Sequence, residues 1–204
     1  METQPYRQRL EARMSDIAER LVATEGLSSV QARRVAQEAD CSVGTLYNVF
    51  GGLDGLLIAV NRRTLDALGA KLTTVARSFE GRPLGERLLA LALSYRDFAF
   101  EQTPRWRALF EHRMEPGRPV PQQYIDDQSK LFGLIEACLT DARTAQPLQA
   151  SAARALFSAV HGIVVLALDN KLGGQTPEET DRQIRFLIGV IGRGLDQAAT
   201  SENG

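Results

Sequence analysis

Apolar residues recur at helical spacing along almost the whole chain of 204 residues. The first such segment, residues 8–24, carries an inner stripe made of Leu10, Met14, Ile17 and Leu21. No segment alternates apolar and polar residues for long enough to indicate a β-strand. The pattern therefore predicts an all-α fold of about nine helices.

Capping residues indicate two further short helices near the N-terminus. The segment Ser28–Gln31 has the spacing of a capping box and predicts a second helix that begins at Ser28 and ends near Ala39. Ser42 is expected to cap a third helix over residues 43–49, because its side chain can accept a hydrogen bond from the first turn. These three helices would form a small N-terminal bundle.

A long fourth helix over residues 53–79 is expected to lead from this bundle into the rest of the chain. We therefore expect an N-terminal domain at residues 1–52 and a second helical domain at residues 53–204. Prolines and glycines separate the remaining helices, which are expected at residues 83–102, 105–114, 122–142, 149–172 and 177–198. The helix at 149–172 is apolar almost all round, so both of its faces should be covered.

Composition indicates a soluble globular protein, with 44% apolar and 24% charged residues. The longest uninterrupted apolar run, Ile163–Leu168, is too short to cross a bilayer, and we expect no membrane association and a cytoplasmic location. Cys41 and Cys138 are too few for a disulfide framework and lack the spacing of a zinc site. The formal net charge is −1, so bulk electrostatics do not indicate a nucleic-acid partner.

The third helix carries the most informative surface. Leu46 and Phe50 are spaced to pack inward. The outward positions are then Val43, Gly44, Thr45, Tyr47 and Asn48. Such a face can enter a DNA major groove, where glycine permits close approach and hydroxyl and amide groups bind bases or phosphates. The alternative is a capped surface turn in an ordinary helical bundle.

The combined spacing over residues 10–60 resembles the TetR family of repressors. The matching positions are Ala18-x-x-Leu21, Gly26, Val35-Ala36, Ser42-Val43-Gly44-Thr45-Leu46-Tyr47-x-x-Phe50 and Leu56-Leu57. The resemblance implies a three-helix DNA-binding head with a recognition helix at 43–49, on an all-helical body that binds a ligand and dimerises. It also implies that Thr45 and Tyr47 contact DNA.

Three positions depart from this resemblance. Val30, Val49 and Leu53 stand where the family commonly has polar or basic residues that hold phosphates. Their loss predicts a weaker grip on the DNA backbone, which basic residues on the first two helices can offset. The candidates are Arg7, Arg9, Arg13, Arg33 and Arg34, of which we assign Arg33 and Arg34 to the DNA-binding site.

The second domain supplies aromatic side chains for a site that binds a small apolar or amphipathic effector. The candidate ligand-binding residues are Tyr95, Phe98, Trp106, Phe110, Tyr124, Phe132, Phe157 and His161. For each of them, ordinary core packing is the alternative. His112 is expected to be paired with a neighbouring charge.

The last helix carries an apolar stripe that predicts a homodimer interface. The stripe consists of Ile184, Leu187, Ile188, Ile191 and Leu195, and Gly189 and Gly192 would permit close helix approach. A two-fold dimer would place two recognition helices about 34 Å apart on a pseudo-palindromic operator.

These patterns predict a ligand-responsive DNA-binding regulator, with repression favoured. The alternative is an interaction or ligand-binding module of the same fold that does not recognise DNA specifically. An enzyme is disfavoured, because the sequence has two histidines, no metal-ligand spacing and no phosphate-binding glycine loop. No cofactor or metal is expected.

Overall fold

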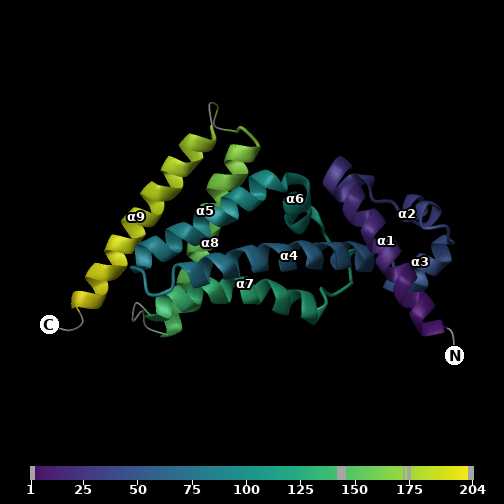
Figure 1. The fold of residues 1–204 in the computed structure, drawn as a ribbon, viewed down its shortest axis with the longest axis horizontal. Coiled ribbons are helices and arrows are strands. Elements are labelled where there is room, and N and C mark those ends of the chain that lie inside the picture. The colour runs from purple at the N-terminus through teal and green to yellow at the C-terminus, as the bar shows by residue number, and fades with distance from the viewer. Residues whose placement is uncertain (1–2, 142–145, 172, 174–175, 202–204) are drawn as a thin grey trace. The chain divides into compact units, whose positions relative to one another are not determined.

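The protein is described here by a computed structural model covering residues 3–141, 146–171, 173 and 176–201 (Figure 1). Every regular element in this part of the chain is a helix, which confirms the all-α prediction. The α-helices are α1 (Thr3–Glu25), α2 (Ala32–Glu38), α3 (Val43–Phe50), α4 (Leu53–Ser78), α5 (Leu84–Glu101), α6 (Thr103–Glu111), α7 (Gln122–Asp141), α8 (Gln146–Leu168) and α9 (Pro177–Ser201). A short 3-10 helix, η1 (Leu27–Ser29), follows α1.

The start of α2 differs from the sequence prediction. The helix begins at Ala32, and its N-cap Gln31 makes no side-chain capping bond. The Ser29 hydroxyl instead donates to the carbonyl oxygens of Gly26, at 2.7 Å, and Leu21, at 3.2 Å. The predicted capping box over Ser28–Gln31 was therefore wrong, because a serine of this segment ties the turn back to α1 rather than opening α2.

The described chain forms two compact units. The first contains Met1–Ala67 and Glu101–Asp127, and the second contains Leu68–Phe100 and Gln128–Gly204. This division differs from the expected boundary after residue 52, because the first part of α4 and the whole of α6 group with α1–α3. Within the first unit, α4 and α6 are joined by a buried hydrogen bond. The Asn61 side-chain amide donates to the Ala108 carbonyl oxygen at 3.2 Å.

The first unit is organised around an apolar cluster that we call the head core. Its members are Leu10, Met14, Ala18, Leu21, Val22, Val30, Val35, Ala39, Leu46, Leu56, Leu57, Val60 and Ala108. The three departures from the family pattern belong to this packing: Val30 is 4% exposed, and Val49 and Leu53 pack against the cluster. Apolar residues at these positions therefore contribute to the core instead of facing phosphates.

The second unit buries one side of α8 and one side of α9, which contact each other (Figure 1). Ile184 and Ile188 of α9 are 0% and 3% exposed, so they lie inside this unit rather than on a surface that a second copy could meet. A Cβ at Gly192 would lie 3.4 Å from the Gly85 Cα, so Gly192 accommodates α5 of the same unit. Leu187 and Ile191 are half-buried, and the side chain of Leu195 lies outside the described residues.

By length and composition alone, the Gln149–Leu168 segment of α8 could cross a membrane. The uninterrupted run Ile163–Leu168, considered by itself, does not reveal this. Core helices of soluble proteins have the same composition. Within this chain 28% of the segment is buried, and Leu166 remains 38% exposed. The chain by itself therefore leaves apolar surface of α8 uncovered.

Candidate nucleic-acid interface

A tight turn places α3 directly after α2. Asp40 adopts a positive φ of 55°, and the Cys41 N–H donates to the Ala36 carbonyl oxygen at 2.9 Å. The Ser42 hydroxyl then accepts from the Thr45 N–H at 3.1 Å, as an N-cap does. Gly51, with a φ of 73°, ends the helix in the left-handed conformation that favours glycine. Local chemistry thus determines both ends of α3.

The two faces of α3 differ in burial. Leu46 is 0% exposed in the head core, and Phe50 packs against it. On the opposite side, Gly44, Tyr47 and Asn48 are exposed, and Tyr47 retains 50% of its accessible surface.

We call Val43, Gly44, Thr45, Tyr47 and Asn48 the outer face of α3. Val43 and Thr45 are half-buried, and the Thr45 hydroxyl lies 2.9 Å from the Ser42 hydroxyl. The outer face carries no ionisable group other than the Tyr47 phenol. It can therefore offer hydrogen bonds and apolar contact to a groove, but no net charge.

Arg34, one of the two arginines assigned to DNA, is held by acidic residues of its own domain. Its guanidinium binds both carboxylate oxygens of Glu25, at 2.6 and 2.7 Å, and Glu38 at 3.2 Å. The hydrogen bond from Arg34 is the main reason that the pKa of Glu25 is lowered. Arg20 also pairs with Glu38. The structure therefore places Arg34 in an ion-pair network between the end of α1 and α2.

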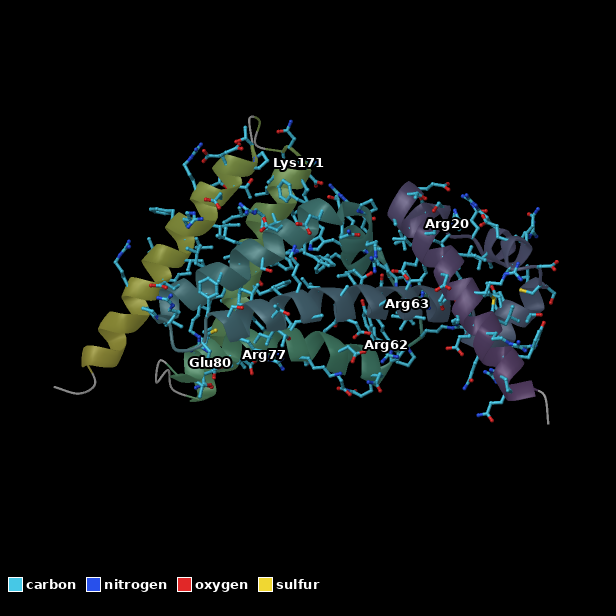
Figure 2. All side chains as sticks on the ribbon, viewed as in Figure 1. Arg20, Arg62, Arg63, Arg77, Glu80 and Lys171 are labelled. Carbon is cyan, nitrogen blue, oxygen red and sulfur yellow. The ribbon has the colours of Figure 1, made fainter. Side chains whose placement is uncertain are left out.

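Other basic side chains of this unit are engaged in a similar way. Arg63 of α4 extends to α1 and binds Asp16 at 2.6 Å and Glu19 at 2.9 Å (Figure 2). Arg105 of α6 also binds Glu19, at 2.6 Å. Burial alone would lower the pKa of Arg63, but the two carboxylates outweigh this and raise it. These ion pairs connect α1, α4 and α6.

The remaining arginines of α1 and α2 have two different environments. Arg7 donates to the Asn48 carbonyl oxygen at 3.4 Å, and Arg13 donates to the Glu38 carbonyl oxygen at 3.2 Å. Both therefore lie near the C-terminal ends of neighbouring helices, where a positive charge is favourable. Among the residues that the structure describes, Arg9 and Arg33 are exposed and form no ion pair. Among the arginines of α1 and α2, Arg9 and Arg33 are thus the most available to phosphates.

The predicted effector residues divide between the two units. Trp106, Phe110 and Tyr124 belong to the first, where the rings of Trp106 and Phe110 are 5.1 Å apart and Phe110 is 45% exposed. Phe98 is buried in the second unit, to 5% exposure.

The remaining four residues form what we call the aromatic cluster: Tyr95, Phe132, Phe157 and His161. Phe157 is central, since its ring centroid lies 5.3–5.5 Å from each of the other three. The Tyr95 hydroxyl is 2.8 Å from His161 Nδ1. Burial lowers the pKa of His161, and Nδ1 of the neutral ring can accept a hydrogen bond from the Tyr95 hydroxyl.

Sequence reasoning expected His112 to be paired but did not identify its partner. The His112 Nε2 atom lies 3.1 Å from Oδ1 of Asp54, in the first turn of α4. An acidic residue in a first helical turn is common, so nothing in the sequence indicates that Asp54 is buried beside a residue 58 positions away.

The structure gives no indication of a metal centre in the described part of the chain, where no three His, Cys, Asp or Glu side chains are grouped suitably. Cys41 and Cys138 are free thiols, and burial raises the pKa of Cys41.

The capped turn, the buried support of α3 and its exposed outer face together define a helix-turn-helix DNA-binding protein with an all-helical body. Residues 15–60 match the family described as bacterial regulatory proteins, tetR family. Residues 88–191, half of the chain, match the tetracyclin repressor-like C-terminal domain. The chain belongs to the TetR family of transcription regulators.

Curated relatives agree with this assignment. Two proteins described as HTH-type transcriptional regulator BetI, from Brucella anthropi and Brucella canis, are each 28% identical to this chain, over 113 and 118 residues. These matches cover 55% and 56% of this chain and 57% of each relative. The similarity thus spans little more than half the length of the relatives.

Solved structures share the fold over nearly the whole chain. A protein of unknown function from Rhodococcus sp. RHA1 has a TM-score of 0.74 and 23% identity, covering 92% of this chain and 95% of its own. A tetR-family transcriptional regulator from Streptomyces coelicolor has a TM-score of 0.62 and 22% identity, covering 98% and 87%. The TetR family regulator PfmR from Thermus thermophilus has a TM-score of 0.60 and 18% identity, covering 89% and 97%.

The different environments of Arg33 and Arg34 lead to a first prediction. We expect Arg33→Ala to reduce the slope of log affinity against log salt concentration by about 0.9 for each phosphate that the variant no longer neutralises. We expect Arg34→Ala to leave the slope unchanged and to lower thermal stability, because Glu25 loses its partner and Glu38 keeps only Arg20. Fluorescence anisotropy with duplex DNA at several salt concentrations measures both slopes. The reverse result would assign the phosphate contact to Arg34.

Proposed function

We propose that this protein is a ligand-responsive repressor that binds a pseudo-palindromic operator as a homodimer and is released by a small apolar or amphipathic molecule. The observation that supports this proposal most is the exposed outer face of α3. Leu46 and Phe50 anchor the opposite face in the head core, and the chain belongs to the TetR family. Such a helix can read base edges in the major groove. We place the protein in the cytoplasm, where it meets DNA.

In this proposal, α3 recognises the operator with few charged side chains. Tyr47 and Asn48 are exposed beside Gly44, where the backbone can approach DNA closely. Because many arginines of the first unit are engaged in ion pairs, general attraction to DNA would depend on Arg9 and Arg33. Specific contacts and phosphate contacts therefore come from different helices.

The alternative is a protein of the same fold that does not recognise DNA specifically. It is favoured by the internal pairing of Arg34 and by the apolar packing of Val30, Val49 and Leu53. Selection of bound sequences from random duplex DNA distinguishes the two functions. Enrichment of a two-fold symmetric site with half-sites about one turn apart supports the repressor, whereas no enrichment supports the alternative.

Tyr47 provides the second prediction. On the selected duplex, we expect Tyr47→Ala to weaken specific binding by about tenfold or more, which corresponds to about 1.4 kcal/mol. Tyr47→Phe keeps the ring and removes only the hydroxyl, so it separates ring contacts from a hydrogen bond to phosphate. Anisotropy titration measures both variants. Unchanged affinity of Tyr47→Ala would exclude Tyr47 from the interface.

The proposed homodimer uses a face of α9 that leaves out the buried Ile184 and Ile188 of the predicted stripe. Phe186 and Val190, four residues apart on this helix, are 74% and 46% exposed, and Leu166 of α8 is 38% exposed. Large apolar side chains exposed together on neighbouring helices are typical of an interaction surface. Leu187 and Ile191, which are only half-buried, can contribute to the same interface.

The third prediction tests this face. We expect Phe186→Asp to convert the dimer into a monomer, because a charge would replace a large apolar contact at the interface. Phe186→Leu, which stays apolar, should remain dimeric. Light scattering coupled to size-exclusion chromatography gives both masses. A dimeric Phe186→Asp protein would place the interface elsewhere.

For the effector, we propose the aromatic cluster as the binding site. It combines three aromatic rings with one polar pair, Tyr95 and His161, which suits a mostly apolar molecule with a single polar group. Arg154 adds a cation 5.6 Å from the Phe132 ring centroid. An effector that prefers the DNA-free arrangement by a few kcal/mol is sufficient to release the operator.

The fourth prediction concerns Phe157, which contacts every other member of the cluster. For a compound that raises the melting temperature of the wild-type protein and releases it from DNA, we expect Phe157→Ala to need about tenfold more compound for release. Operator affinity without the compound should not change. Trp106→Phe in the first unit serves as the control. If Phe157→Ala and the wild type are released from DNA at the same concentration of compound, the effector does not bind at the aromatic cluster.

A further inference from the structure

A buried carboxylate stands at the start of α4, directly after the recognition helix α3. Asp54 is 8% exposed, and both of its oxygens accept hydrogen bonds from the segment that follows α6. His112 Nε2 lies 3.1 Å from Oδ1, and the Glu115 N–H donates to Oδ2 at 2.9 Å. We call these two interactions the Asp54 latch. Its two sides are about 60 residues apart in sequence but belong to the same compact unit.

The segment after α6 is shaped to reach this position. His112 is the C-cap of α6 and adopts an extended conformation, so the chain leaves the helix there. The Arg118 N–H donates to the Glu115 carbonyl oxygen at 3.0 Å and closes a turn. The Arg118 guanidinium lies beside Gly52, where an added Cβ would be 3.0 Å from its nearest nitrogen. The segment therefore meets the α3–α4 junction at two points, Asp54 and Gly52.

The junction itself leaves little freedom between α3 and α4. The Gly51 N–H donates to the Tyr47 carbonyl oxygen at 2.8 Å and closes the end of α3. The Phe50 carbonyl oxygen packs so tightly on Gly55 that a Cβ at this position would collide with it. The end of α3 is therefore in direct contact with the first turn of α4, so a group that holds Asp54 also acts on the end of α3.

The surroundings of Asp54 favour its ionised form. Burial acts to raise the pKa of Asp54, but the hydrogen bonds from Glu115 and His112 and the charges of His112 and Arg118 outweigh it, so the pKa is lowered. The carboxylate is therefore ionised near neutral pH. Removing a donor would leave a buried anion with an unsatisfied oxygen, which is costly.

We propose that His112 is a positioning residue for DNA recognition, which sets the orientation of the outer face of α3 through the Asp54 latch without touching DNA. The inference depends on the proposed operator binding, and it adds a determinant of specificity outside the helix-turn-helix. Loss of the latch lets α3 leave its groove-matched orientation. Specific binding then weakens, whereas the attraction of Arg9 and Arg33 to phosphates remains.

The test compares His112→Ala with His112→Gln, whose amide can still donate to Asp54. On the duplex selected by the wild-type protein, we expect His112→Ala to bind about tenfold more weakly, and His112→Gln to recover most of the affinity. On a duplex of scrambled sequence, all three proteins should bind equally. Arg113→Ala, at an exposed position of the same segment, is the matched control and should bind as the wild type does.

Two outcomes would overturn the role of His112. One is wild-type specific affinity in His112→Ala, and the other is an equal loss on both duplexes, which indicates a general loss of folded protein. If His112→Ala does not fold, His112→Asn replaces it, because its shorter side chain cannot span the distance to Asp54 and remains polar.

A second measurement is independent of operator binding. Without DNA, hydrogen exchange of the amides of α3 should be faster in His112→Ala than in the wild type and should return toward the wild-type rate in His112→Gln. Unchanged exchange would overturn the latch. If the wild-type protein selects no operator, the proposed function fails, while the exchange rates still decide whether His112 holds α3.

Discussion

The arrangement of the DNA-binding unit depends on the burial of the first half of α4 in the head core. Leu56 and Val60 are at most 1% exposed and pack with Leu46 of α3 and Met14 of α1. Complete burial of such a side chain contributes about 1.5–3 kcal/mol. A head ending at residue 52 would lack these side chains, which explains why the compact unit continues into α4 and includes α6. The recognition helix is thus supported by residues that follow it in sequence.

In a DNA-binding unit, arginines are expected to bind phosphates, but here several of them bind carboxylates of the same unit. Arg34 and Arg63 are engaged by carboxylates of neighbouring helices, so much of the basic content stabilises the arrangement of α1, α2, α4 and α6. Asp54 shows the same principle with the signs reversed, since a buried anion collects donors from a distant segment. The formal net charge of the chain, −1, is consistent with such internal pairing.

The sequence predicted what depends on local pattern. Helical periodicity and capping residues together indicated the nine α-helices of the described chain, and the spacing of Leu46 and Phe50 correctly identified the inner face of α3. The i,i+4 spacing of Arg34 and Glu38 indicates a local ion pair that Arg33, with Gln37 at i+4, cannot form, but the bond of Arg34 to Glu25 of α1 could not be predicted. Periodicity also identifies an apolar stripe but not the element that covers it. The sequence therefore placed Ile184 at a dimer interface, whereas the structure buries it within the chain.

The separation between the reading surface of α3 and its support has an evolutionary consequence. Tyr47 and Asn48 point away from the head core, and even Gly44 has room for a methyl group, whose nearest neighbour would be the Ser42 hydroxyl oxygen at 3.6 Å. Substitutions at these positions change hydrogen-bonding groups while the buried packing stays the same. A gene duplicate could therefore acquire a new DNA sequence preference in a few steps, each of which preserves a folded regulator.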